Sequence, residues 1–363
     1  MKIFTEILKI VLKNKSVPKT QLVNEPFKVV CFFSNTAIGD TLFNTPVFRA
    51  FKEKFPNVKT IALLNPKNMT LFNNNPNLDE IVSYNGRWNG FLKALKILKT
   101  KNIDICFLLH SNDPQATPLA ILSGAKYVFK LPNLKNEFNF LHSNKPQNYN
   151  EPNQYIVLNR LKQLEFISIK SSDTKLSLYL NDSDYKAVDN VLKKDEKTKF
   201  IGFQMGASAI SKQWLKERWV ELARLILNEP NTKIVLTGSP NERAMTNELF
   251  KAINDKRVLN LAGVFNVREA AALIGRLDVL ITPDTGPLHI AVALNVPVVG
   301  LFGVTEPKSY MPNYNQDIFK FIKVDFKMDD SFSKHKDYSY VMEKITAQDV
   351  FNEIKHIVFK CIN

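Results

Sequence analysis

The chain has 363 residues, of which 45% are hydrophobic and 23% are charged. These proportions are typical of a globular protein and exclude a disordered chain, and the length favours two domains. The net charge of +14 indicates an anionic partner: nucleic acid, phospholipid headgroups, or a phosphorylated or carboxylated substrate. Three widely spaced cysteines (Cys31, Cys106 and Cys361) favour reduced thiols in a cytosol, with neither a disulfide framework nor a metal knuckle.

The N-terminal segment 1–24 is basic and amphipathic. Its apolar residues recur at helical spacing, while Glu6 and Lys9 interrupt any signal-peptide core. The pattern predicts a helix that either rests on an anionic membrane or packs on its own domain. The longest apolar stretch, 290–302, is interrupted by Asn295 and Pro297 and falls short of the roughly 20 residues that span a bilayer.

The first regular unit is a strand at 27–33, a loop at 34–40 and a helix that begins at Thr41. The loop carries Asp40, which either caps this helix or faces a ligand at the carboxyl edge of a parallel sheet. Neither a dinucleotide-binding Gly-x-Gly-x-x-Gly motif nor a Walker A motif occurs in the sequence.

Strands and helices alternate through both halves of the chain, which predicts two doubly wound α/β domains. The first half continues with strands at 60–64, 80–83 and 103–109 and helices at 91–99 and 155–164. The segment 171–180 reads as the crossing between domains. The second half has helices at 185–192, 214–227, 241–253 and 267–275 and strands at 200–204, 233–237 and 258–260. Asp182 and Asp184 resemble a metal-binding pair, but their place at a helix start favours capping.

The stretch 277–303 predicts a strand at 279–282, a tight turn at 283–286, a short helix from Pro287 to about Leu294, and a second strand at 296–302. Free N–H groups at the helix start, beside Asp284, Thr285 and Gly286, are suited to a nucleotide phosphate. His289 lies in the first helical turn, where an aliphatic residue would be usual. The alternative is an ordinary helix start that binds nothing.

Two further loops follow strands of the same predicted domain. In the first, Gly206, Ala207 and Ser208 allow close approach of a ligand to the backbone, and Lys212 brings positive charge to a phosphate. In the second, Glu242 either accepts hydrogen bonds from a sugar hydroxyl or lies on a solvated surface.

Three blocks, in this order, resemble one known family. They are Ile38-Gly39-Asp40 after the first strand, Lys212-Gln213-Trp214 followed by Arg218-Trp219, and Asp284-Thr285-Gly286-Pro287-Leu288-His289-Ile290-Ala291 followed by the 297–303 sequence PVVGLFG. The chain thereby resembles glycosyltransferase family 9, the bacterial lipopolysaccharide heptosyltransferases, from about Lys28 to the C-terminus.

The resemblance implies a GT-B fold, in which two facing Rossmann-like domains enclose a central cleft where the three loops converge. It also implies an inverting, metal-independent enzyme without cofactors that uses ADP-L-glycero-D-manno-heptose. Asp40 would be the catalytic base, and Lys212 would act in both catalysis and donor binding. The other donor-binding residues are predicted to be Gly39, Ala207, Ser208, Glu242, Phe265, Asp284, Thr285, Gly286 and His289.

The predicted domains are the N-terminal extension 1–24, an acceptor-binding domain 25–175, a nucleotide-sugar-binding domain 176–345, and a C-terminal helix 346–363 that packs back on the N-terminal domain. An anionic lipid-linked oligosaccharide, the inner core of lipopolysaccharide or lipooligosaccharide, is the expected acceptor, with His110, Asn112 and Asp113 as candidate contacts. Such an acceptor implies a cytoplasmic protein, peripheral on the inner face of the inner membrane.

Three alternatives remain open at this stage: another nucleotide-sugar donor, a non-lipopolysaccharide glycan acceptor, or a catalytically silent nucleotide-sugar-binding protein. Nucleic-acid binding is not expected, because no helix-turn-helix, RNA-binding or zinc motif appears.

Overall fold

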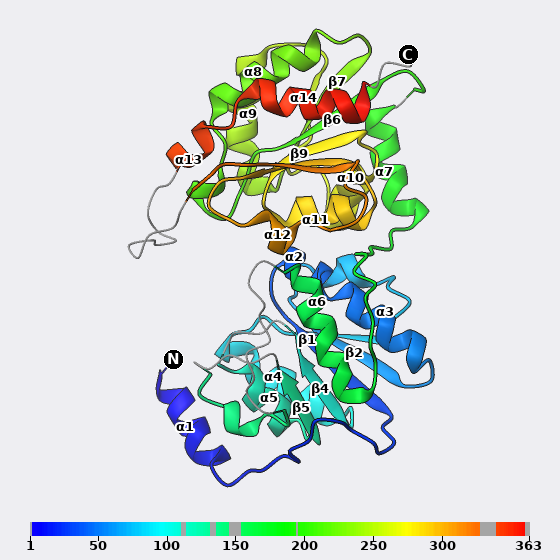
Figure 1. Ribbon diagram of the computed structural model, residues 1–363, viewed down its shortest axis with the longest axis vertical. Helices are drawn as coiled ribbons and strands as arrows, with labels where there is room; N and C mark the ends of the chain where they lie inside the picture. The colour runs from blue at the N-terminus through cyan, green and yellow to red at the C-terminus, as the bar shows by residue number, and fades with distance from the viewer. Residues whose placement is uncertain are drawn as a thin grey trace. The chain divides into compact units, whose positions relative to one another are not determined.

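The computed structural model describes residues 2–109, 114–130, 136–144, 154–193, 195–326 and 339–359 (Figure 1). The chain divides into two compact units, Met1–Tyr179 and Leu180–Asn363. Within the described ranges, no helix is long and apolar enough to cross a membrane.

The first unit is built on a five-stranded sheet in the order β3-β2-β1-β4-β5, and every neighbouring pair of strands is parallel. The strands are β1 (Val29–Ser34), β2 (Lys59–Leu64), β3 (Glu80–Ser83), β4 (Ile105–Leu108) and β5 (Tyr127–Lys130). The sequence predicted the first four within two residues at each end and missed β5. Strand order reverses between β1 and β4, so the loops after these strands flank the switch point of the sheet.

Helices cover both faces of this sheet, as a doubly wound fold requires (Figure 1). They are α2 (Ile38–Leu42), α3 (Thr45–Lys54), α4 (Trp88–Lys99), α5 (Ala116–Leu122) and α6 (Ile156–Leu161), with 3₁₀ turns η1 (Met69–Phe72), η2 (Asn139–Leu141) and η3 (Lys162–Ile167). Helices α4 and α5 bury one face. On the other face Phe32, Phe107 and Phe129 stack side by side across β1, β4 and β5 and form the core beneath α3.

The N-terminal extension begins with helix α1 (Lys2–Leu12), which confirms the predicted helix. Leu8 and Leu12 pack against the first unit, and Phe4 stacks on Trp88 of α4 with ring centroids 5.4 Å apart. The following segment stays on the same unit, because the Val23 N–H donates to the Phe166 carbonyl at 2.8 Å.

The second unit contains a six-stranded parallel sheet in the order β11-β10-β9-β6-β7-β8. Its strands are β6 (Lys199–Gln204), β7 (Thr232–Thr237), β8 (Val258–Asn260), β9 (Val279–Pro283), β10 (Val298–Phe302) and β11 (Phe319–Lys323). From one edge to the other this is the Rossmann order, with the third, second and first strands followed by the fourth, fifth and sixth. The switch point therefore lies between β6 and β9.

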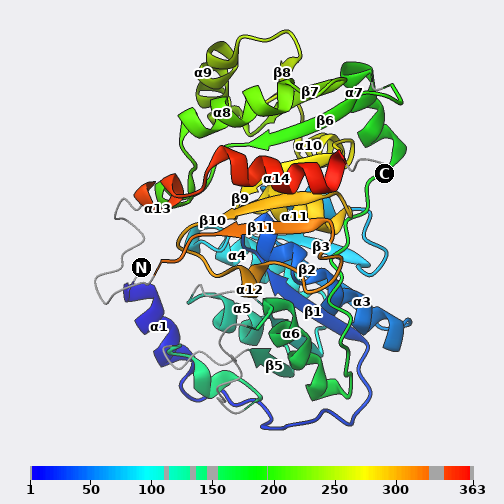
Figure 2. The same ribbon diagram turned by 45° about the horizontal axis from the view of Figure 1, so that its top comes forward.

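The helices of the second unit are α7 (Asp182–Leu192), α8 (Lys216–Leu227), α9 (Arg243–Ile253), α10 (Val267–Gly275), α11 (Gly286–Ala293), α12 (Pro307–Tyr310), α13 (Ser339–Glu343) and α14 (Ala347–Val358), with turns η4 (Ile210–Lys212) and η5 (Pro240–Glu242). Helix α14 runs beside α8 over β9, β10 and β11 (Figure 2). Its buried residues Val350, Phe351 and Ile354 belong to the core of this unit. The expectation that the C-terminal helix packs back on the N-terminal domain was therefore wrong: its apolar face is used by the sheet of its own unit.

Candidate active site

The carboxyl edge of the second sheet brings together most of the predicted donor-binding residues. The loop after β6 carries Lys212, and the turn after β9 carries Asp284. These are the two strands on either side of the switch point, where open α/β sheets commonly bind ligands. The order of the strands therefore explains why two loops that are far apart in sequence form one site.

The turn after β9 leads into α11, which begins one residue before the predicted start. Thr285 occupies the N-cap position, but its hydroxyl makes no cap bond. It lies instead 3.0 Å from the Thr282 hydroxyl and donates to the Pro283 carbonyl at 3.3 Å. The start of α11 thus lacks a side-chain cap, a condition that leaves backbone N–H groups available to an anion.

Asp284 lies between two basic side chains. Lys212 Nζ donates to Asp284 Oδ2 at 2.6 Å and to the Asp284 carbonyl at 3.3 Å, and His289 Nε2 lies 3.8 Å from Oδ1. The Asp284 side chain is 6% exposed and that of Lys212 is 23% exposed. Burial raises the pKa of the Asp284 carboxyl, but the interaction with His289 and the charge of Lys212 outweigh burial and hold this pKa well below its usual range. Asp284 is thus an ionised anchor that holds Lys212 at the rim.

The Lys212 loop is fixed from behind by an aromatic side chain. The Trp214 indole N–H donates to the Ile345 carbonyl at 3.0 Å, and the ring packs on Trp219 of α8 with centroids 5.0 Å apart. The loop is thereby tied to the connection between α13 and α14. In the predicted block Lys212-Gln213-Trp214, Lys212 is the charged residue at the edge of the site, and Trp214 is the buried residue that fixes the loop.

Glu242 is held by a chain of polar contacts and is not a simply solvated side chain. The Thr237 hydroxyl donates to Gln204 Oε1 at 2.9 Å, and Gln204 Nε2 donates to Glu242 Oε1 at 3.1 Å. The Ser239 N–H donates to the other carboxylate oxygen at 2.6 Å. Gly206 leaves room for this carboxylate, since a Cβ there would lie only 1.2 Å from Glu242 Oε1. The loops after β6 and β7 are therefore locked to each other.

The remaining donor-binding candidates lie around the same edge. Ala207 is half-buried and Ser208 is exposed in the loop after β6. Phe265 is half-buried after β8, just before the Asn266 cap of α10. Its loop joins that of Glu242 through the Gly263 N–H, which donates to the Gly238 carbonyl at 2.8 Å.

Asp40 lies in the first unit and does not begin the helix that was expected to start at Thr41. It lies inside α2, whose N-cap is Ala37, so the capping alternative for Asp40 was wrong. The single helix that the sequence predicted from Thr41 is divided into α2 and α3, because Asn44 and Pro46 start a new helix. Gly39, in the same turn as Asp40, is buried.

The partner of Asp40, which was not predicted from the sequence, is Arg160 on α6. Arg160 Nη2 lies 3.3 Å from Asp40 Oδ1, and Nη1 donates both to the Asp40 carbonyl and to Asn44 Oδ1. The Arg160 side chain is buried, whereas the Asp40 side chain is 27% exposed. A buried guanidinium therefore fixes a carboxylate that reaches solvent. The only hint in the sequence was an arginine among the apolar residues of a predicted helix.

Other predicted features have plain outcomes. Asp184 closes a capping box with Asn181 and pairs with Arg268 at 2.5 Å, which confirms the capping interpretation. Within the residues that the structure describes, no group of three or more His, Cys, Asp or Glu side chains is placed to hold a metal ion. The candidate acceptor contacts His110, Asn112 and Asp113 lie outside the described residues.

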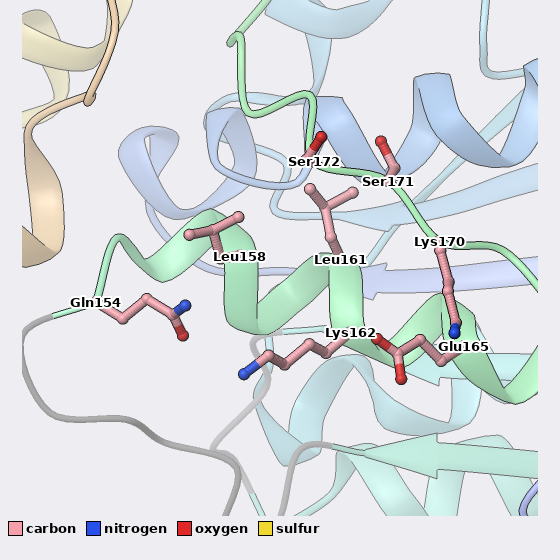
Figure 3. A pocket seen from close by; sticks show the side chains of 8 residues that line it. All are labelled: Gln154, Leu158, Leu161, Lys162, Glu165, Lys170, Ser171 and Ser172. Carbon is pink, nitrogen blue, oxygen red and sulfur yellow. The ribbon is translucent and has the colours of Figure 1, made fainter.

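A hollow of about 350 Å³ also marks the first unit, between α6 with η3 and the segment 170–172 (Figure 3). It is lined by Gln154, Leu158, Leu161, Lys162, Glu165, Lys170, Ser171 and Ser172. None of the predicted site residues lines this hollow. Arg160 lies on the same helix but is not among the lining residues, and it bonds to Asp40 instead. The hollow is a feature separate from the candidate site.

Comparisons with known proteins agree with the motifs. A model of "Glycosyltransferase family 9 (heptosyltransferase)" matches residues 137–339, more than half of the chain. The lipopolysaccharide core heptosyltransferase OpsX of Haemophilus influenzae is 28% identical over 304 residues, which are 82% of this chain and 85% of that protein.

Solved structures share the fold. The crystal structure of the glycosyl transferase family 9 from Veillonella parvula matches with a TM-score of 0.78 and 18% identity, over 94% of this chain and 100% of that chain. The ADP-heptose lps heptosyltransferase II of E. coli matches with a TM-score of 0.75 and 19% identity, over 92% and 99%. These likenesses confirm the expected α/β class, GT-B with two Rossmann-like domains. The facing arrangement and the central cleft stay predictions.

Proposed function

The chain belongs to glycosyltransferase family 9, and on this premise we propose that it is an inverting, metal-independent heptosyltransferase. The donor would be ADP-L-glycero-D-manno-heptose, and the acceptor would be the inner core of lipopolysaccharide or lipooligosaccharide. The observation that carries the proposal is the Lys212–Asp284 pair beside the uncapped start of α11, at the switch point of the second sheet.

The donor diphosphate would bind at this pair. Negative charge builds up on the diphosphate as it leaves the anomeric carbon, and preorganised N–H groups and an ammonium stabilise that charge. Lys212 and the start of α11, next to Thr285 and Gly286, would supply both. Asp284 would not touch the phosphate oxygens, because its carboxylate is buried and negative; it would hold Lys212 and His289 in position.

The nucleoside part of the donor would lie along the same edge. Glu242 keeps a carboxylate fixed by Gln204 and Ser239, which suits hydrogen bonds from the two hydroxyls of a ribose. Ala207 and Ser208 would border the diphosphate, and Phe265 would give the base an apolar surface.

Asp40 would act as the general base, with Gly39 next to it near the donor. In a single displacement the acceptor hydroxyl oxygen bonds to the anomeric carbon, and its proton passes to Asp40. The bond from that carbon to the diphosphate oxygen breaks, and its electron pair leaves with ADP. One displacement inverts the anomeric configuration. Arg160 would keep the Asp40 carboxylate pointed at the acceptor. In this proposal the first unit supplies the base and the second unit holds the donor.

The acceptor would be anionic and lipid-linked, and its phosphates and carboxylates would suit the net charge of +14. We propose that the first unit binds it, with His110, Asn112 and Asp113 as candidate contacts. The reaction would take place in the cytoplasm, at the inner face of the inner membrane, where a lipid-linked acceptor is anchored.

Calorimetric titration tests the donor and the role of each charge. We expect ADP-heptose and ADP, but not UDP-sugars, to bind equally with Mg²⁺ and with a chelator. Lys212→Met should weaken ADP binding by about tenfold or more, the loss expected for one charge-assisted contact of about 1.4 kcal/mol. The matched control Lys216→Met, at an exposed lysine on α8, should bind as the wild type does.

Transfer to a purified core acceptor tests the chemistry. Asp40→Asn should bind ADP-heptose normally but slow transfer by about 10²–10⁴-fold, the usual contribution of a general base. NMR of the product should show an anomeric configuration opposite to that of the donor. Binding that requires Mg²⁺, or binding of a UDP-sugar instead, would overturn the donor assignment. A wild-type protein that binds the donor but transfers to no acceptor would be a silent binding protein.

A further inference from the structure

Helix α1 exposes an apolar strip that the first unit does not cover. The strip consists of Ile3, Ile7, Ile10 and Val11, whose exposed fractions lie between 49% and 75%. Phe4 beside them is also exposed on one side, but its ring stacks on Trp88. The four strip residues are among the fourteen exposed large apolar side chains of the residues that the structure describes, and they fall within nine consecutive positions. Scattered exposed apolar residues are ordinary on a protein surface, but a strip of this density marks an interaction surface.

The strip is not the side by which α1 is attached. Leu8 and Leu12 make the attachment, through the cores beneath α4 and η2. At 3.6 residues per turn, these two residues lie to one side of Ile3, Ile7 and Ile10 on the helix surface. Helix α1 therefore has an apolar arc wider than the contact it buries, and it lies at the periphery of the first unit in both views (Figures 1 and 2).

Exposed lysines lie near this strip. Residues 1–24 contain five lysines against the single acid Glu6. Lys13 and Lys15 are exposed, whereas Lys9 pairs with Glu6 and Glu137. Helix α4, which meets α1 where Phe4 stacks on Trp88, carries three exposed lysines and no acid. An apolar strip with lysines beside it suits an anionic bilayer, because the apolar side chains enter the acyl boundary and the lysines meet the headgroups. In a dimer through the same strip, the lysines of the two copies would repel each other.

We propose that the apolar strip of α1 docks the first unit on an anionic phospholipid bilayer. The helix lies in the plane of the interface, with Ile3, Ile7 and Ile10 among the acyl chains. Lys13 and Lys15, which follow α1, and the exposed lysines of α4 lie among the headgroups, so binding weakens as salt screens their charge. This surface uses no residue of the candidate active site, and the inference stands independently of the proposed reaction.

Co-sedimentation of the full chain with vesicles, without donor or acceptor, tests the inference. We expect binding to vesicles of equal parts phosphatidylcholine and phosphatidylglycerol, and at least about tenfold weaker binding to phosphatidylcholine alone. Ile7→Glu with Ile10→Glu should weaken binding to the anionic vesicles by about tenfold or more. Both positions are solvent-exposed, and glutamate favours helix, so the variant should keep the wild-type circular dichroism and melting temperature.

The matched control is Val191→Glu, which places the same charge on an exposed apolar residue of α7 in the second unit. It should bind vesicles as the wild type does. A second variant, Lys13→Gln with Lys15→Gln, keeps the apolar strip, and should lose affinity and part of the salt dependence.

Equal vesicle binding by the wild type and the Ile7→Glu, Ile10→Glu variant would overturn the proposal, as would equal binding to neutral and anionic vesicles. Sedimentation velocity tests whether a second copy of the chain, and not a bilayer, covers the strip. A wild-type dimer that the α1 variant makes monomeric, with no vesicle binding by either, would make the strip an interface between copies. Donor binding by calorimetry is a separate readout, so a failure here and a failure of the proposed reaction are told apart.

Discussion

The Lys212–Asp284 pair predicts a specific pattern of stability losses in a double-mutant cycle. Lys212→Met leaves the Asp284 carboxylate, 6% exposed, without its main counter-charge. Removing one partner of a buried pair costs about 3–5 kcal/mol, and we expect about 3 because Lys212 is partly solvated and His289 stays nearby. Asp284→Asn should cost about 1.5 kcal/mol, because the ammonium can turn to water. The double variant should lose only about 2 kcal/mol, since neither charge then remains.

Tryptophan fluorescence can follow the second unit alone. The chain has three tryptophans, and Trp88 is the one in the first unit, so a Trp88→Phe background leaves Trp214 and Trp219 as reporters. Urea unfolding of this background and its three variants gives the cycle. The exposed pair Lys216–Glu248, with N and O 3.5 Å apart, is the control and should show a coupling below about 0.5 kcal/mol.

Across the four proteins of the cycle, the affinity for ADP should not change in parallel with the free energy of unfolding. The double variant regains stability relative to the sum of the single losses, but it still lacks the Lys212 ammonium and should bind ADP as poorly as Lys212→Met. Additive stability losses, within about 0.5 kcal/mol, would refute the anchoring role of Asp284. Recovery of ADP binding in the double variant would refute the contact between Lys212 and the donor.

Three further predictions concern other contacts. Arg160→Met should lower kcat for transfer by about tenfold or more with little change in ADP affinity, because it frees the Asp40 carboxylate; single-turnover kinetics and calorimetry check this. Gly206→Ala should weaken ADP binding severalfold by displacing Glu242, whereas Ala209→Gly, at a half-buried position of the same loop, should not. Burial and nearby lysine charges lower the pKa of His142 to about 3, so the unfolded chain takes up the proton first as the pH falls. The first unit should therefore lose roughly 1.4 kcal/mol of stability per pH unit between about pH 6.5 and pH 3, and acid titration of His142→Gln should show a shallower slope.

The sequence predicted the sheets well because their strands are continuous apolar runs. The strand at 279–283 and the helix after it were predicted to within one residue at each end. Pro283 and Pro287 mark the turn between them, and Asn295 marks the end of the helix. Two strands, β5 and β11, were not predicted. Each is a short apolar run that is interrupted or ended by lysine, beside polar loops, which gives little sign of a buried strand. Helix α2 was missed because one turn of helix before Asn44 gives too little periodicity to detect.

The site was predicted as a set of residues but not as a set of contacts. Asp284 reads in sequence as part of an anion-binding turn, whereas the structure turns its carboxylate to Lys212, 72 positions earlier. Arg160 lies 120 positions from Asp40, and no local pattern can pair them. Glu242 is the exception: Ser239 and Glu242 have the spacing of a capping box, a local signal that could have predicted a fixed carboxylate from the sequence alone.

The bond from Trp214 to the Ile345 carbonyl has a consequence for synthesis of the chain. The Lys212 loop is translated early in the second unit, but its anchor appears 131 residues later. At about 5–20 residues per second, the loop waits on the order of ten seconds before its support leaves the ribosome. During that time the sheet also lacks α14, which covers β9, β10 and β11. The Lys212 loop therefore gains this support only after Ile345 has been made, and a truncated product that ends before Ile345 would lack it.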